Sequence, residues 1–139
     1  MITILLIAAL HLHILWTETP ANSCAHPGTI VIACFKEPDT IYLDSQDKNL
    51  KFSLSHELGH ASGFDVDKAI RKVIDKYPAI RQYPLNVYPT AELREREKVA
   101  DWFAFYLTNE NGANYPKLFQ EDYPDIYKVF TEKVNQIVK

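Results

Sequence analysis

The chain has 139 residues, of which 47% are hydrophobic and 24% are charged, and its 15 Lys and Arg residues against 18 Asp and Glu residues give a formal net charge of −3. This apolar fraction and small net charge exclude an intrinsically disordered chain, and four Gly with eight Pro exclude a collagen-like or linker-rich one. The acidic balance and the absence of a basic stripe also argue against direct binding to nucleic acid, so we expect one globular domain spanning residues 1–139.

The N-terminal segment, residues 1–16, is almost uninterruptedly apolar. It has no positively charged start and no small-residue cleavage site after it, and it is shorter than the ~20 residues that span a membrane. We therefore expect no membrane segment, and a buried helix over about residues 2–10 that runs directly into a strand. A secretory signal is the less favoured alternative for this stretch.

Three short runs rich in Ile, Val, Tyr and Phe come next, separated by turn-forming residues. They lie at residues 13–17, 29–35 and 40–43 and predict the strands of a small sheet. Cys24 and Cys34 are too few for a disulfide framework and lack a CxxC spacing, so two reduced thiols are the simplest interpretation. A single disulfide between them stays open.

The pattern becomes helical from Leu50 onward. Helices are predicted over about residues 50–62, 66–77, 90–107 and 123–138, with Gly63 at the end of the first and Thr90 as the N-cap of the third. Residues 78–89, rich in Pro and Tyr, predict a long loop. Because the strands precede the helices, the sequence indicates an α+β fold rather than βαβ alternation.

The most informative stretch is the HELGH run from His56 to His60. Residues four apart lie on one face of a helix, so the two histidines can bind one metal ion while Glu57 lies beside the ion's open position. Two imidazoles at this spacing suit Zn²⁺, and we expect one zinc ion per chain with Glu57 as general base. The alternative, a coincidental pair of histidines, is disfavoured by the apolar Leu54 and Leu58 on the same predicted helix.

A third ligand decides the subclass of zinc site. The metzincin pattern requires His or Asp at position 66 and a methionine downstream. Position 66 is Val, Asp65 and Asp67 are each one residue out of register, and Met1 is the single methionine. We therefore expect the third ligand to come from a second helix, at Glu97.

The helix predicted over residues 90–107 supports this choice. Glu97 and Asp101 are four residues apart and share one face, and Ala100 and Ala104 keep that face small enough for a close helix contact. We expect Asp101 to hydrogen-bond the far nitrogen of a ligand histidine. The alternative for Glu97 is a solvent-exposed position among the neighbouring charges.

An HExxH zinc site with a glutamate base is typical of metallopeptidases, which also stabilise an oxyanion. Tyr83 and Tyr88 in the predicted loop are candidates to support the metal in that role. The alternative is that these rings pack the proline-rich loop. A peptide substrate is expected to bind extended beside an edge strand, with residues 29–35 or 40–43 as that edge.

A family resemblance follows from these motifs. The matching residues are Lys51, Phe52, Ser53, Leu54 and Ser55 before HELGH, and Glu97, Ala100, Asp101, Phe103 and Ala104 after it. Over about residues 10–107 the chain resembles the ImmA/IrrE family of zinc metallopeptidases. The resemblance implies a compact gluzincin-like fold, with a small N-terminal sheet packed on a helical active-site layer. Asp101 stands where the family more commonly has Asn.

The resemblance also implies a function. We expect a zinc-dependent endopeptidase that cuts a protein substrate in the bacterial cytoplasm, such as a DNA-binding repressor of a phage or mobile element, or another regulatory protein. Two alternatives stay open: an antirestriction-type or toxin-type zincin, and a metal-dependent binding module that sequesters its partner without cleavage. Replacement of Glu57 by Gln separates cleavage from sequestration.

Overall fold

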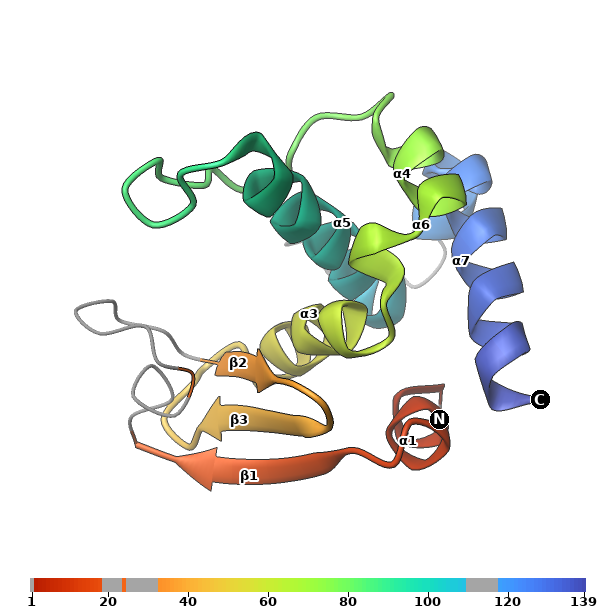
Figure 1. The fold of residues 1–139 in the computed structure, drawn as a ribbon. Helices are drawn as coiled ribbons and strands as arrows, with labels where there is room; N and C mark the ends of the chain where they lie inside the picture. Colours follow the sequence, from red (N-terminus) through yellow and green to blue (C-terminus); the bar gives the residue numbers. More distant parts are fainter. Residues whose placement is uncertain (1, 19–23, 25–32, 110–117) are drawn as a thin grey trace.

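The computed structural model describes residues 2–18, 24, 33–109 and 118–139. Figure 1 shows a small sheet at the bottom of the view, with α3 (Leu50–Ala61) lying over it and α5 (Ala91–Thr108) above α3. The helices α4 (Lys68–Ile74), α6 (Leu118–Asp122) and α7 (Pro124–Val138) lie to the right. Strands and helices are both present, with all three strands ahead of α3 and α5 in the chain. The α+β class predicted from the sequence is therefore confirmed.

The described residues form a three-stranded sheet in the order β1-β3-β2, from β1 (His13–Thr17), β2 (Ala33–Lys36) and β3 (Thr40–Asp44). β1 runs parallel to β3, and β2 runs antiparallel to β3. The predicted strands are found, although residues 29–32 lie outside the described part. Because β3 is central, the expectation that residues 40–43 offer a free edge is wrong. β2 is an edge strand among the described residues.

Helix α1 (Ile2–Ala9) occurs where it was expected, but the expectation that it is buried is wrong. Leu6 is fully buried, whereas Ile4 is 67% exposed. A helix that is apolar on every side gives no pattern from which to read which face meets the core. No helix in the described part of the chain is long and apolar enough to cross a membrane.

Helices α3 (Leu50–Ala61) and α5 (Ala91–Thr108) make the contact that matters most for the site. At their closest approach, a Cβ built on Gly59 would lie 3.0 Å from the Cα of Ala100. Ala100 is fully buried there. The small residues at this crossing let the two helices approach closely, as the sequence indicated.

The start of α5 is also as predicted. The side-chain oxygen of Thr90 accepts a hydrogen bond of 3.1 Å from the backbone N–H of Leu93, which makes Thr90 the N-cap. This cap sets where the helical turns begin, and so which residues of α5 face α3.

The helix predicted over residues 66–77 is shorter than expected. Phe64–Val66 forms a 3₁₀ turn, η1, and α4 (Lys68–Ile74) begins after Asp67, whose carboxylate accepts a hydrogen bond from the backbone N–H of Ile70. Val66, the first residue of the predicted helix, is 52% exposed. The cap at Asp67 has extended backbone, which separates η1 from α4.

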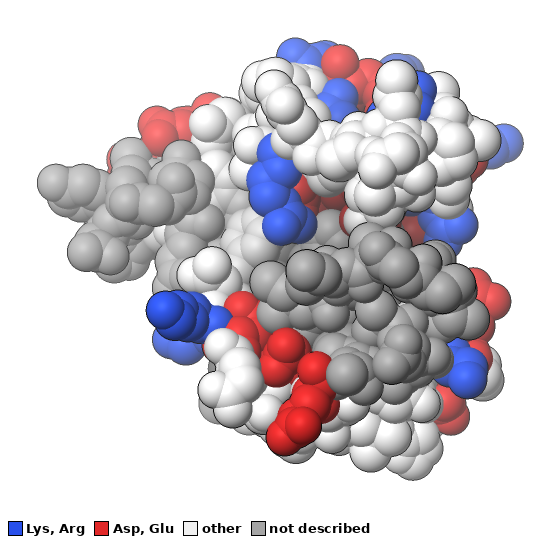
Figure 2. All heavy atoms as spheres, turned by 90° about the vertical axis from the view of Figure 1, so that its left-hand side faces the viewer, with Lys and Arg blue, Asp and Glu red and all other residues white. Residues whose placement is uncertain are grey.

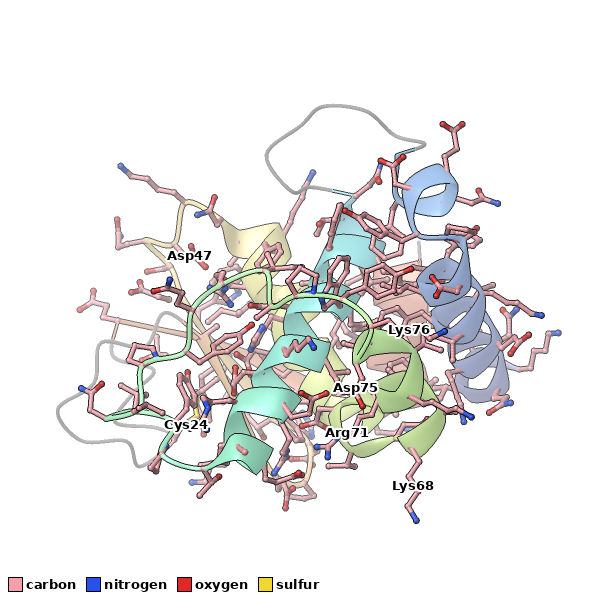
Figure 3. The ribbon with its side chains drawn as sticks, turned by 90° about the horizontal axis from the view of Figure 1, so that it is seen from above. Cys24, Asp47, Lys68, Arg71, Asp75 and Lys76 are labelled. Atoms are coloured by element: carbon pink, nitrogen blue, oxygen red, sulfur yellow. A yellow bond between two sulfur atoms is a disulfide. The ribbon has the colours of Figure 1, made fainter. Side chains whose placement is uncertain are left out.

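Helices α4 and α7 complete the core. α4, marked in Figure 3 by Lys68 and Arg71, lies beside α5, and Arg71 makes two hydrogen bonds of 2.7 and 2.8 Å to Glu92. α7 (Pro124–Val138), predicted over residues 123–138, has Pro124 in its first turn and buries Ile126, Phe130 and Val134. The short α6 (Leu118–Asp122) was not predicted.

Cys24, labelled in Figure 3, forms a disulfide with Cys34 of β2. Their Cα atoms are 6.3 Å apart, within the usual range for a disulfide. The interpretation of two reduced thiols is therefore wrong. Two cysteines ten residues apart carry no sequence signal for pairing, because pairing depends on a tertiary structure that the spacing does not contain.

Candidate metal centre

Three side chains from two helices converge on one point. His56 and His60 come from α3, and their Nε2 atoms are 3.2 Å apart. Glu97 comes from α5, and its two carboxylate oxygens lie 2.8 Å from Nε2 of His56 and 3.2 Å from Nε2 of His60. One ligand atom from each of the three residues lies within 4.8 Å of the other two, so the group could hold a metal ion.

The donor set and spacing fit a tetrahedral ion with three protein ligands. Bonds of ~2.0–2.1 Å in a tetrahedral zinc site place neighbouring ligand atoms ~3.3 Å apart. The contacts of 2.8–3.2 Å among His56, His60 and Glu97 are close to that value. Two imidazoles and one carboxylate leave a fourth position open on the cleft side.

Asp101 orients the first ligand histidine, in the place where the sequence analysis expected it. Its Oδ1 lies 2.7 Å from Nδ1 of His56, and the side chain is fully buried. Arg81 binds the same carboxylate through Nε and Nη2, at 2.9 and 2.5 Å. Burial alone would raise the pKa of Asp101, but hydrogen bonds from His56 and Arg81 outweigh burial and lower it.

Asp65 does the same for the second ligand histidine, and the sequence analysis missed it. Its Oδ2 lies 2.7 Å from Nδ1 of His60, and it also accepts a hydrogen bond of 2.8 Å from Nε of Arg96. Asp65 is one residue out of register for the metzincin ligand, so the sequence pattern gives it no role. The signal in the sequence was Gly63, because a turn at this glycine brings the carboxylate two residues later back toward His60.

These two carboxylates aim both imidazoles the same way. With each Nδ1 bound to an aspartate, the Nε2 atoms of His56 and His60 face Glu97. Burial lowers the pKa of both histidines, but the hydrogen bonds that they donate to an aspartate and to Glu97 outweigh it and raise the values to about 9 and about 10. The centre therefore favours a positive charge, which a proton or a metal ion can supply.

Glu57 stands next to this centre with its side chain almost fully buried. Its Oε1 lies 4.0 Å from Nε2 of His56. Burial raises the pKa of Glu57, while the two histidines and a backbone hydrogen bond from Phe35 act in the opposite direction. The result is a carboxylate that accepts a proton more readily than an exposed glutamate does.

The centre opens into a cleft of about 470 Å³. Its floor is formed by His56, Glu57, His60 and Glu97, one side by Ala33, Cys34 and Phe35 of β2, and the other by Leu93 and Arg96 of α5 together with Arg81, Tyr83 and Tyr88. Figure 2 faces this side of the molecule and shows Lys and Arg side chains next to Asp and Glu side chains where the surface is hollowed. A cleft of this size is ordinary for a ligand site.

The two tyrosines of the loop differ. The hydroxyl of Tyr83 donates a hydrogen bond to Asp101 and lies 3.3 Å from the backbone oxygen of Glu97, so it is already engaged. Tyr88 packs edge-on against Tyr83 with ring centroids 5.9 Å apart, and its hydroxyl has no hydrogen-bond partner among the residues that the structure describes. Burial and the nearby charges of Glu97 and Glu57 raise its pKa to about 12, which keeps it a donor.

Comparison with models of known protein families, with curated protein sequences and with solved structures found no significant match for this chain.

Proposed function

We propose that this chain is a zinc-dependent endopeptidase that hydrolyses a peptide bond in a protein substrate. The observation that supports this most is the convergence of His56, His60 and Glu97 with Glu57 beside them at the floor of an open cleft. An imidazole pair, a carboxylate ligand and a separate carboxylate base are the components of metal-assisted peptide hydrolysis.

The choice of zinc rests on the donor set. Two imidazole nitrogens and one carboxylate oxygen suit a borderline-soft ion, whereas Mg²⁺ and Ca²⁺ prefer an all-oxygen shell. The outer nitrogens of both histidines are bound to Asp65 and Asp101, an arrangement common around zinc. A bound zinc ion would lower the pKa of a water ligand toward ~7 and polarise the scissile carbonyl.

The chain's own residues divide the remaining work. Glu57 accepts the proton of the attacking water and delivers it to the leaving amine. Tyr88, which lines the same cleft as Glu57 and Glu97, donates a hydrogen bond to the developing oxyanion. Tyr83 holds Asp101 in place, and Asp101 in turn holds His56.

Strand β2 supports the binding of an extended peptide. Its residues Ala33, Cys34 and Phe35 line the cleft, and among the described residues its only strand partner is β3. A peptide that adds to the other edge of β2 gains main-chain hydrogen bonds without a demand on its sequence. Its backbone would then run past Glu57.

The proposed substrate is a regulatory protein, such as a DNA-binding repressor of a phage or mobile element. This part of the proposal is supported by the resemblance of the HELGH helix and the Glu97 helix to the ImmA/IrrE family. The cytoplasmic location stays a prediction, and the Cys24–Cys34 disulfide weighs against it, because disulfides are rare in that compartment.

Glu57→Gln tests the proposal. The purified chain should contain about one zinc and should cleave members of a library of quenched fluorogenic peptides. Glu57→Gln should keep the zinc and lose activity by ~10²–10⁴-fold, since the general base is gone. Glu132→Gln, an exposed position on α7, is the matched control and should behave as the parent protein.

Two results would count against hydrolysis. If Glu57→Gln cleaves as fast as the parent, Glu57 is not the base. If neither protein cleaves any peptide but both bind zinc and a protein partner equally well, the chain is a metal-dependent binding module.

A further inference from the structure

Arg96 stands beside the metal centre without being a ligand. Its Nε donates to Oδ2 of Asp65 at 2.8 Å, and the same oxygen lies 2.7 Å from Nδ1 of His60. A single carboxylate oxygen therefore separates the guanidinium from the imidazole of a candidate ligand. Arg96 also lines the cleft, one helical turn after Leu93 on the same face of α5.

Most of the hydrogen-bonding capacity of Arg96 is unused. A guanidinium carries five N–H donors in a planar fork. Among the residues that the structure describes, only Nε of Arg96 has a partner, and the side chain is 37% exposed. Because Nε is fixed on the buried Asp65, the plane of the group is oriented and its two amino groups are available to the cleft.

Arg81, the other arginine of the cleft, is in a different position. It uses Nε and Nη2 on Asp101, and its guanidinium lies over the ring of Phe52, 5.3 Å from the centroid. Both the charge and the geometry of Arg81 are committed to Asp101. Arg96 is therefore the better candidate in the cleft for binding a ligand.

The other charged side chains of the cleft limit where a negatively charged ligand can bind. Glu37, Glu57 and Glu97 also line it, and all three carboxylates repel an incoming anion. A guanidinium that receives a substrate carboxylate offsets this repulsion. Two parallel N–H groups bind a carboxylate through a bidentate pair, which fixes both its place and its direction.

We propose that Arg96 binds a carboxylate of the substrate close to the scissile bond, so that the chain selects an acidic group at one position of its substrate. The carboxylate is either that of an Asp or Glu side chain or that of the peptide's own C-terminus. This inference rests on the proposed function, because it takes the ligand to be the peptidase's substrate. The binding site itself is a property of the cleft and is tested without turnover.

The test uses the full chain with Glu57→Gln, loaded with zinc, so that binding is measured without cleavage. The probes are peptides of neutral sequence blocked at both ends, in which a single Glu is moved along the peptide, each with a Gln twin. A second series has no acidic side chain and carries either a free or an amidated C-terminus. Calorimetry or fluorescence anisotropy gives the affinity of each pair.

We expect one position in one series at which the charged member binds about tenfold more tightly than its neutral twin. Adding Arg96→Gln should bring that ratio to about one. Lys98→Gln, which removes the same charge from the same helix outside the cleft, should leave it unchanged. Zinc is measured for each variant, and every ratio is taken at full zinc occupancy, so that a loss of zinc cannot imitate the loss of Arg96.

The series that shows the effect identifies the source of the carboxylate. A ratio of one at every position, or a ratio that persists after Arg96→Gln, overturns the assignment of Arg96. An Arg96-dependent ratio in a protein that cleaves no peptide when Glu57 is intact would keep the carboxylate site and overturn the peptidase proposal instead.

Discussion

At the scale of residues, the centre consists of two parallel chains of contacts. Arg81 holds Asp101, which holds His56, and Arg96 holds Asp65, which holds His60. In each chain a buried carboxylate accepts from the outer nitrogen of an imidazole, which turns Nε2 toward Glu97 and leaves it as the nitrogen that can bind an ion. The ligand side chains are thus oriented before any ion binds, so they lose less conformational entropy when it does.

Asp65→Asn tests this orientation. The amide can still accept from His60, but it loses the charge that both His60 and Arg96 use, so zinc affinity should fall by ~10–100-fold. The measurement is a zinc competition titration against a chromophoric chelator. Asp67→Asn is the control, because Asp67 caps α4 and pairs with Lys133 but makes no contact with the centre. Equal affinities in Asp65→Asn and the parent would show that His60 needs no charged partner.

At the scale of elements, the site depends on how closely α3 and α5 approach. The two histidines lie on one helix and Glu97 on the other, so a shift of either helix changes all the ligand distances at once. Gly59 lies between the two histidines in sequence, at the place where α3 meets Ala100. Its lack of a side chain is a condition of the metal centre as well as of packing.

Gly59→Ala should therefore lower both stability and zinc affinity. Alanine favours the helix by about 1 kcal/mol over glycine, but its Cβ would lie 3.0 Å from the backbone of Ala100, and overpacking costs ~1–3 kcal/mol. Gly63→Ala is the contrast: its φ of 77° strains an alanine, yet nothing lies within 4 Å of the added Cβ. Chemical denaturation should show a loss of stability in both variants. A zinc titration should show a loss of affinity only in Gly59→Ala.

A more stable Gly59→Ala protein with unchanged zinc affinity would mean that α3 and α5 can separate without cost.

The elements also show which parts of the structure could be predicted from sequence. Residues His56, His60 and Glu97 could be identified because helical spacing places side chains on a face whatever the surroundings are. Asp65, Arg81 and Arg96 could not be assigned roles, because their contacts cross turns whose path the pattern does not contain. The central place of β3 and the disulfide were missed for the same reason: strand order and sulfur pairing depend on connections between elements.

At the scale of the whole molecule, the centre concentrates charge in a fold of modest size. Asp65, Asp101, Glu57 and both histidines are buried or nearly so. Such charges reduce the stability of a folded chain unless they are paired. The carboxylates lower their cost by holding positive charge on the imidazoles, so the stability of the metal-free chain depends on protonation.

The metal-free chain should accordingly lose stability as the pH rises above neutrality. The pKa values of His56 and His60 are raised from 6.5 to about 9 and about 10 on folding, so their stabilisation is complete below pH 6.5 and lost as the pH rises through the folded values. The pKa values of Glu97, Asp65 and Asp101 are lowered, so their contributions are lost only in acid. Thermal unfolding followed by circular dichroism, with a chelator present, should show Tm falling between pH 7 and pH 10.

Zinc should remove this fall, because the ion takes the place of the protons and adds binding free energy, about 4 kcal/mol when its free concentration is 1,000 times Kd. A His13→Gln variant is the control, since His13 lies on β1 away from the centre and should leave both curves unchanged. A metal-free Tm that is level or rising from pH 7 to pH 10 would contradict the positively charged centre, and with it the reason why these residues should attract a cation.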